Sequence, residues 1–209
     1  MIYLIGGPPR CGKTTLAKRM SKKFGIPWIS TDTLEVVSGE YMTQKQWNKS
    51  HPYSVLRHKL KTNDEFYNKL SAQKIISVLQ REACATFPAI EMTALCEIKD
   101  GNDYIIEGYH IVPSFAQKMI KKCGKKNVRA IFLAKFDANK FAQDVHKSTT
   151  PNDWLIVLTK KQETFIKVGK MVSLYSRYFE KEAKKFGLRV FNTDVNFDNQ
   201  INNAIKYLI

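Results

Sequence analysis

The sequence predicts an α/β doubly wound fold, in which a five-stranded parallel sheet lies between two layers of helices. Two observations lead to this prediction. Short apolar runs alternate with helical patterns along the chain, and each run is almost continuously apolar, as in strands that are covered on both faces. The expected strands lie at residues 2–5, 27–30, 104–106, 128–133 and 188–191. Ligands bind such folds at the carboxyl ends of the strands.

The helices between these strands show as apolar side chains spaced three and four residues apart. The clearest pattern runs from Phe165 to Phe186, with lysines and an arginine off the apolar stripe. Gly187 follows it directly and supplies the backbone freedom that a helix end requires. A second long helical pattern runs from Asp64 to Ala83. We therefore expect both segments to be helices that pack on the sheet or beside it.

The chain length of 209 residues suits one domain, residues 1–209. About 70 residues separate the second and third strands, and most of them have helical character. We expect residues 33–102 to form a helical insertion that binds an acceptor molecule; the alternative is that it only covers the sheet. Residues 135–161, after the fourth strand, are expected to form a lid.

The composition is that of a globular protein, with 44% hydrophobic and 25% charged residues. No stretch approaches the ~18 apolar residues of a membrane span, and the first apolar run is too short for a signal peptide, so we expect a cytoplasmic protein without a membrane partner. The four cysteines form no Cys-x-x-Cys pair, which argues against a zinc site or a disulfide framework. The formal net charge of +15 makes a nucleic acid possible but does not favour it, because the basic residues are scattered. The oligomeric state stays open.

A phosphate-binding loop follows the first expected strand. Residues 7–14 read Gly-Pro-Pro-Arg-Cys-Gly-Lys-Thr and match the pattern G-x-x-x-x-G-K-[ST] of a P-loop, or Walker A motif. A strand before it and a helical pattern after it are the context that this motif needs. The motif predicts binding of ATP with Mg²⁺. The candidate ATP-binding residues in this segment are Gly7, Arg10, Cys11, Gly12, Lys13, Thr14 and Thr15.

The residue types of the loop suit this chemistry. The glycines let backbone N–H groups approach a phosphate, and Lys13 is a mobile charge that can follow the β- and γ-phosphates, which makes it a catalytic candidate. The Thr14 hydroxyl is a hard oxygen ligand for Mg²⁺. Cys11 is either a small spacer or a redox switch. Arg10 is either a solvated side chain or a phosphate contact.

Two carboxylates come at the ends of the second and third strands. Asp32 would lie beside the γ-phosphate, where it can take the acceptor's proton or hold a metal-bound water; its alternative role is a helix N-cap. Glu107 suits a Walker B role, binding Mg²⁺ through water, and its alternative role is structural. His110 follows at the same edge, where it could contact the acceptor. Asp32, Glu107 and His110 are therefore candidate acceptor-binding residues, and Asp32 and Glu107 are also candidate metal ligands.

Three blocks, residues 6–17, 29–32 and 105–113, resemble the 2-phosphoglycerate kinases and related P-loop small-molecule kinases. The resemblance to adenylate-kinase-like folds extends to the last strand, where it implies that Asn192 and Thr193 contact adenine.

Kinases of this broad group carry arginines in a lid, whereas this chain has none between Arg129 and Arg177. Arg177 is the remaining catalytic candidate, facing either the nucleotide or open water. Three lysines of the lid region, Lys135, Lys140 and Lys147, can substitute only partly, because a lysine lacks the bidentate fork of arginine. Arg57, in the insertion, is a candidate acceptor-binding residue.

The sequence thus predicts an ATP-dependent phosphotransferase that acts on a small hydroxylated or phosphorylated metabolite. One alternative is a kinase for nucleotides or nucleic-acid ends, which the positive charge would favour. Another is an ATPase switch of the AAA type, although the chain lacks the additional helical domain and the trans-acting arginine of such ring ATPases. The identity of the acceptor and the preference for ATP over GTP stay open.

Overall fold

The computed structural model describes residues 1–148 and 152–209, and within them five strands form one parallel sheet. The strand order is β2-β3-β1-β4-β5. The predicted fold class is confirmed, and each predicted strand is present to within about two residues. The strands are β1 (Ile2–Gly6), β2 (Trp28–Ser30), β3 (Tyr104–Glu107), β4 (Val128–Ala134) and β5 (Arg189–Asn192).

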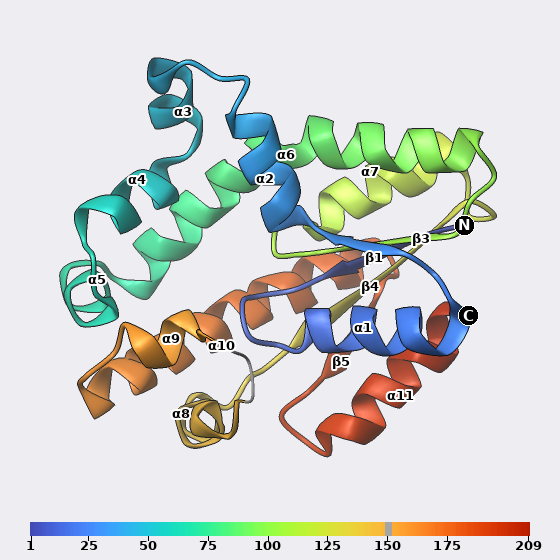
Figure 1. Ribbon diagram of the computed structural model, residues 1–209. Helices are drawn as coiled ribbons and strands as arrows, with labels where there is room; N and C mark the ends of the chain where they lie inside the picture. Colours follow the sequence, from blue (N-terminus) through green and yellow to red (C-terminus); the bar gives the residue numbers. More distant parts are fainter. Residues whose placement is uncertain (149–151) are drawn as a thin grey trace.

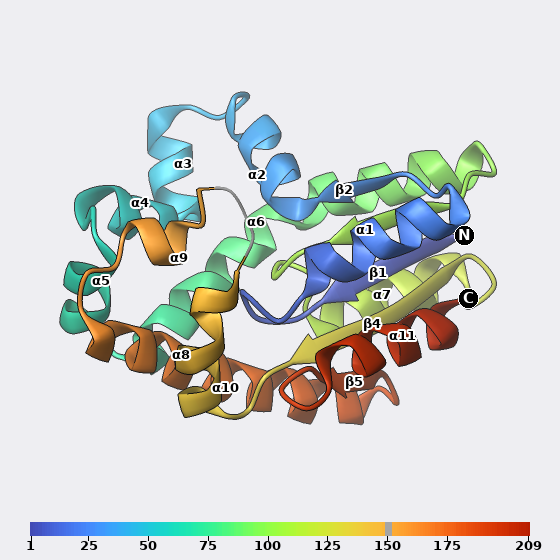
Figure 2. The same ribbon diagram turned by 60° about the horizontal axis from the view of Figure 1, so that its bottom comes forward.

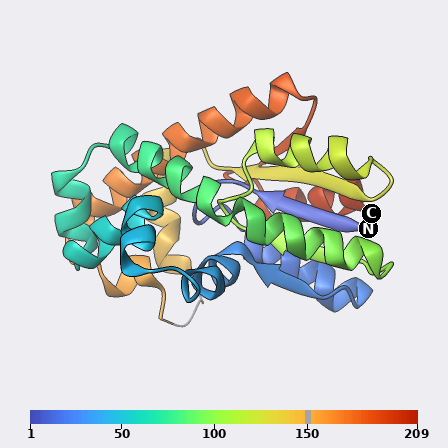
Figure 3. The ribbon, with the colours of Figure 1, turned by 90° about the horizontal axis from the view of Figure 1, so that it is seen from above.

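Helices cover both faces of the sheet, which explains why the central strands are continuously apolar. Every residue of β1 is buried, and so are the last three residues of β3. Figures 1 to 3 show the sheet between two helical layers. One layer consists of α1 (Lys13–Phe24) and α11 (Phe197–Leu208); the other consists of α6 (Ala72–Lys99), α7 (Pro113–Cys123) and α10 (Gln162–Lys185).

Two further groups of short elements lie beyond the carboxyl ends of the strands, on the left in Figures 1 and 3. The first group follows β2 and comprises α2 (Thr31–Gly39), α3 (Gln44–Ser50), α4 (Pro52–Lys59) and α5 (Asn63–Lys69). The second follows β4 and comprises α8 (Ala138–Asp144), the 3-10 helix η1 (Val145–Lys147) and α9 (Trp154–Val157). Of the expected lid region, residues 149–151 lie outside the described residues.

One predicted helix is wrong in its extent. The pattern from Asp64 to Ala83 is divided between α5 and α6, because the backbone of Leu70 is extended (φ −121°, ψ 134°). The next residue, Ser71, then starts a new helix, since its side chain accepts a hydrogen bond from the backbone N–H of Lys74. The apolar spacing continues across this break, so periodicity alone could not locate it.

The predicted helix from Phe165 to Phe186 is confirmed as α10, which begins three residues earlier. Gly187 follows with a left-handed backbone (φ 66°), as a helix end requires. In the described part of the chain, none of the helices combines the length and the apolar character that a membrane span needs.

Candidate active site

The P-loop joins β1 to α1, and its glycines are required by its geometry. Gly7 and Gly12 have φ values of 130° and 95°, which side chains rarely tolerate. A Cβ atom on Gly7 would lie 2.1 Å from the carbonyl oxygen of Leu133, and one on Gly12 would lie 2.7 Å from the ring of Phe197. Arg10 also has a positive φ of 66°. The loop is therefore tightly curved, and it packs against β4 and α11.

The side chains of Lys13 and Thr14 both form hydrogen bonds within the protein. The Nζ atom of Lys13 donates to the carbonyl oxygen of Pro8, at 2.7 Å, and the hydroxyl of Thr14 donates to Oε1 of Glu107, at 2.8 Å. Glu107 ends β3, which pairs directly with β1. Burial raises the pKa of Glu107, while nearby Lys13 opposes this shift. The two adjacent oxygens of Thr14 and Glu107 are the hard ligands that suit Mg²⁺.

The other candidate nucleotide residues occupy different positions. Cys11 is fully buried, and burial raises the pKa of its thiol to about 11, so the thiol is protonated at neutral pH and suits a spacer role. The hydroxyl of Thr193 lies 3.1 Å from the carbonyl oxygen of Cys11, which ties the loop after β5 to the P-loop. The side chain of Asn192 instead accepts from the backbone N–H of Asp194, at 2.9 Å.

A single cleft of about 1130 Å³ connects the P-loop with the helical insertion. On the P-loop side it is lined by Arg10, Gly12, Lys13, Thr14 and Thr15, together with Thr193. On the opposite side it is lined by Asp32, Glu35, Tyr53, Arg57, Glu107 and Tyr109. The structure therefore brings most of the predicted ATP-binding and acceptor-binding residues to one space. Gly7, Cys11, Asn192 and His110 do not line it.

Asp32 lies in the first turn of α2, with 69% of its side chain exposed. The alternative prediction that Asp32 is the N-cap is wrong, because Ser30 occupies that position and its hydroxyl accepts from the backbone N–H of Asp32, at 3.2 Å. The carboxylate of Asp32 is thus free to face the cleft.

His110 lies beneath Asp32 and is fully buried. Its side chain does not line the cleft, so the expected direct contact with an acceptor is not possible in this geometry. Its Nδ1 atom is hydrogen-bonded to the hydroxyl of Thr31, at 2.7 Å, and lies 3.8 Å from Oδ1 of Asp32. The ring of Tyr109 covers it, with ring centroids 3.8 Å apart. Burial lowers the pKa of His110 to about 4, so its ring is neutral at pH 7.

Arg57 is held on the cleft wall by aromatic rings. Its guanidinium carbon lies 4.8 Å from the ring centre of Phe66 and 5.7 Å from that of Trp154. Within the described residues its buried Nη1 atom has no hydrogen-bond partner. A cation fixed in this way, with a free donor, suits a negatively charged group of a ligand.

Arg10 is not merely a solvated side chain, because it forms an ion pair with Asp153, whose own side chain is only 3% exposed. This pair links the P-loop to the lid region. Arg10 also lines the cleft, so a phosphate contact stays a prediction.

Arg177 is exposed on α10 and does not line the cleft, so the structure does not bring this catalytic candidate to the site. Lys135, Lys140 and Lys147 do line it. Two of them, Lys140 and Lys147, are paired with the carboxylate of Asp144, at 2.9 and 2.7 Å. Lysines of the expected lid region therefore line the cleft together with Arg10 and Lys13.

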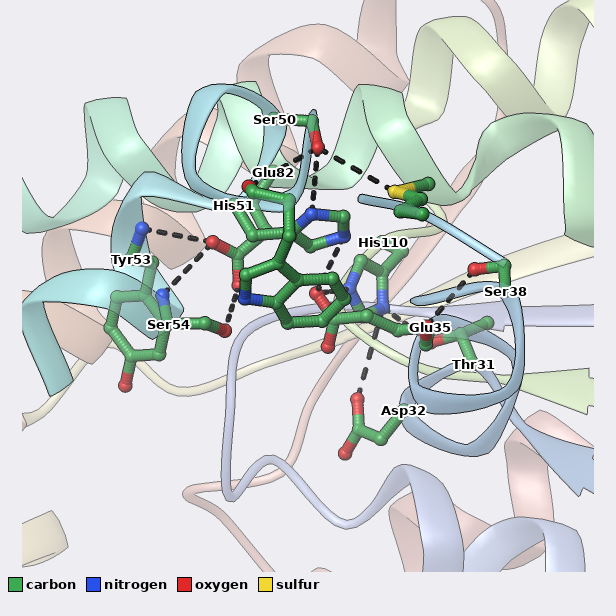
Figure 4. A network of polar contacts seen from close by, with 12 residues as sticks. Thr31, Asp32, Glu35, Ser38, Ser50, His51, Tyr53, Ser54, Glu82 and His110 are labelled. Carbon is green, nitrogen blue, oxygen red and sulfur yellow. Dashed lines mark hydrogen bonds and ion pairs between the residues drawn. The ribbon is translucent and has the colours of Figure 1, made fainter. Parts of the chain in front are cut away.

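Three buried residues near Asp32 were not identified from the sequence: Glu35, His51 and Glu82 (Figure 4). Glu35 follows Asp32 by three residues, one helical turn, and this spacing was the one available signal. His51 precedes α4 and Glu82 lies in α6, and no local pattern connects them with Asp32.

Comparisons with known proteins agree with this geometry. A search of solved structures finds a gluconokinase from Sinorhizobium meliloti 1021, with a TM-score of 0.54 and 11% identity, covering 99% of this chain and 90% of that one. It also finds an uncharacterized protein from Eubacterium ventriosum ATCC 27560, with a TM-score of 0.50 and 15% identity, covering 100% and 97%. At these identities the likeness shows the fold alone, and it agrees with the predicted α/β fold. No curated protein matches the sequence.

A family model matches most of the chain. It is described as "ATPase family associated with various cellular activities (AAA)", and it matches residues 3–166, a span that contains the P-loop, Asp32 and Glu107. The chain therefore belongs to the AAA family of ATPases.

Proposed function

We propose that the protein is an ATP-dependent phosphotransferase that moves the γ-phosphate to a small hydroxylated or phosphorylated metabolite. One observation carries this proposal: the cleft that begins at Lys13 and Thr14 continues without a break to Asp32 and Arg57. An enzyme that only hydrolyses ATP needs no such second region beside the phosphates. A gluconokinase among the structures with this fold is consistent with the same reaction class.

The residues present fit ATP and Mg²⁺. Gly12 lines the cleft at the N-terminus of α1, whose positive end favours a phosphate there. Thr14 and Glu107 would hold the Mg²⁺, directly and through water. When bound, the metal and Lys13 together neutralise charge on the phosphates, which is the main requirement of phosphoryl transfer.

Asp32 would orient the acceptor hydroxyl and take its proton. Its carboxylate is exposed to the cleft, and the buried Thr31–His110 pair lies behind it. Lys13 now donates to the carbonyl oxygen of Pro8 and must turn from it to reach a phosphate, which its flexible stem allows. The lysines of the lid region would approach the same phosphates and exclude water.

A screen of metabolites, with ATP and Mg²⁺ present, tests this function. We expect ADP release that depends on one acceptor, with a phosphorylated product visible by ³¹P NMR. The variant Asp32→Asn is the matched control, since it should bind ATP but not transfer phosphate. ADP release that is identical with and without every acceptor would contradict the proposal.

The family match favours one second candidate, an ATP-dependent switch that controls a protein partner. It predicts negligible phosphorylation of every metabolite together with nucleotide-dependent association with a protein, which co-purification from a lysate with and without ATP would detect. A kinase acting on nucleic-acid ends would instead show acceptor affinity that falls steeply with salt.

A further inference from the structure

A buried cluster lies behind the acceptor half of the cleft, and its members point at one another (Figure 4). The Oε1 atom of Glu35 lies 3.5 Å from Nε2 of His110 and 3.7 Å from Nε2 of His51. In the described residues these three atoms are buried and have no close hydrogen-bond partner. In the same residues, no group of three or more His, Cys, Asp or Glu side chains could hold a metal ion. What this cluster can bind depends on which of its nitrogen and oxygen atoms carry hydrogens.

The direction of the hydrogen bonds is determined at His51. The hydroxyl of Ser50 has one hydrogen, which it directs at the carbonyl oxygens of Gln46 and Trp47, at 2.8 and 3.3 Å. Its oxygen lies 2.8 Å from Nδ1 of His51, which lets it accept from that atom. His51 then carries its hydrogen on Nδ1, and burial lowers its pKa, which keeps the ring neutral. Its Nε2 atom consequently presents a lone pair to Glu35.

Glu35 can face this lone pair only as a protonated acid. Its other carboxyl neighbour, Glu82, already accepts from the backbone N–H groups of Tyr53 and Ser54, at 2.8 and 3.0 Å, and from the Ser54 hydroxyl, at 2.7 Å. A carboxylic acid has one hydrogen, which in Glu35 is directed at His51, and the hydrogen bond between the two carboxyl groups lowers the pKa of Glu35 and raises that of Glu82. Burial raises the pKa of Glu35 to about 7; the hydrogen bond with Glu82 opposes this shift, and the charge of Asp32 adds to it.

On its remaining side Glu35 faces a donor. The hydroxyl of Thr31 can donate to Nδ1 of His110, at 2.7 Å, which leaves the hydrogen of the neutral ring on Nε2, directed at Glu35. The chain of polar contacts then runs in one direction, from Thr31 through His110 and Glu35 to His51 and Ser50, with separations of 3.5 and 3.7 Å on the two sides of Glu35.

Asp32 and Glu35 are one turn apart on α2, and both line the cleft. We propose that Glu35, as a neutral carboxylic acid, binds a second hydroxyl of the acceptor, which is therefore a polyol with one hydroxyl on Asp32 and another on Glu35. The inference rests on the proposed function and narrows its substrate class. A neutral carboxyl offers an oxygen that accepts a hydrogen bond from a hydroxyl of the acceptor.

The directions of the hydrogen bonds can be measured without an acceptor. In protein labelled with ¹⁵N-histidine, NMR at pH 7 distinguishes the two tautomers of each neutral ring. We expect the hydrogen of His51 on Nδ1 and that of His110 on Nε2. A hydrogen on Nε2 of His51 would overturn the proposal, because that atom would then donate to an ionised Glu35.

The second hydroxyl can be tested with glycerol and 1,3-propanediol, which differ only in the middle hydroxyl. With ATP and Mg²⁺, we expect kcat/KM for glycerol to be about five-fold higher, the size of one neutral hydrogen bond. Glu35→Ala should abolish this preference, and Glu35→Gln, which keeps a neutral amide at the same place, should restore part of it. Glu40→Gln, an exposed change just after α2, should leave the preference unchanged.

The outcomes separate the two levels of the proposal. Equal transfer to both alcohols overturns the second-hydroxyl site, and so does transfer to neither alcohol by a protein that phosphorylates another acceptor in the screen. A protein that transfers phosphate to no acceptor at all contradicts the proposed function itself.

Discussion

Glu35 should make the stability of the protein depend on pH in a way that Glu35→Gln removes. Burial raises the pKa of this carboxyl from its ordinary value of 4.5 to about 7. The folded protein thus holds the proton more tightly than the unfolded chain, so the contribution of Glu35 is full below pH 4.5 and is lost as the pH rises through 7. The difference between these two pKa values, at ~1.4 kcal/mol per pKa unit, corresponds to a loss of about 3–4 kcal/mol.

The assay is urea unfolding of the wild type and of Glu35→Gln at pH 5, 6, 7 and 8, followed by tryptophan fluorescence. Between pH 5 and pH 8 the wild type should lose ~2–3 kcal/mol of unfolding free energy relative to the variant, because about a fifth to a quarter of the loss already occurs below pH 5. Other groups, including His110, are present in both proteins, so their effects largely cancel in the difference.

Glu40→Gln is the matched control, since Glu40 is exposed and its replacement should leave the pH profile of the wild type unchanged. If wild type and Glu35→Gln had parallel profiles between pH 5 and 8, Glu35 would not be a neutral acid in the folded protein. The reasoning on the buried cluster would then be refuted, whatever the enzymatic activity.

The remaining predictions concern the cleft. Asp32→Asn should lower phosphate transfer at least 100-fold while the Kd for ATP, measured by calorimetry, stays within two-fold; normal turnover would exclude Asp32 as the base. Arg57→Leu should raise the KM of the acceptor about ten-fold or more with little change in the KM of ATP. A change in the KM of ATP alone would mean that Arg57 contacts ATP and not the acceptor. Gly7→Ala should lower Tm and abolish ATP binding, because its Cβ would lie 2.1 Å from the carbonyl oxygen of Leu133; an unchanged Tm would mean that the loop can relax. Cys11 should react with a thiol reagent at pH 8 far more slowly than the exposed cysteines, as burial raises its pKa to about 11, and equal rates, resolved by mass spectrometry, would favour a redox role.

Much of the fold was predictable because its determinants are local. A run of apolar residues such as 128–133 identifies a buried strand by itself, and Gly187 marks a helix end through its own backbone. The P-loop was predictable for the same reason, since its residues are contiguous. The division between α5 and α6 was not predictable, because Ser71 interrupts the helix while the apolar spacing continues across it.

The sequence by itself therefore determined the P-loop, the order of strands and helices along the chain, and the carboxylates that follow the second strand and end the third. Only the tertiary structure decided what surrounds them. It placed His110 beneath Asp32 and left Arg177 outside the cleft. It also joined Glu35 and His51 in one buried cluster. The physical reason is that periodicity and backbone propensity act over a few residues, whereas a buried polar cluster depends on which side chains the packing of distant helices deprives of water.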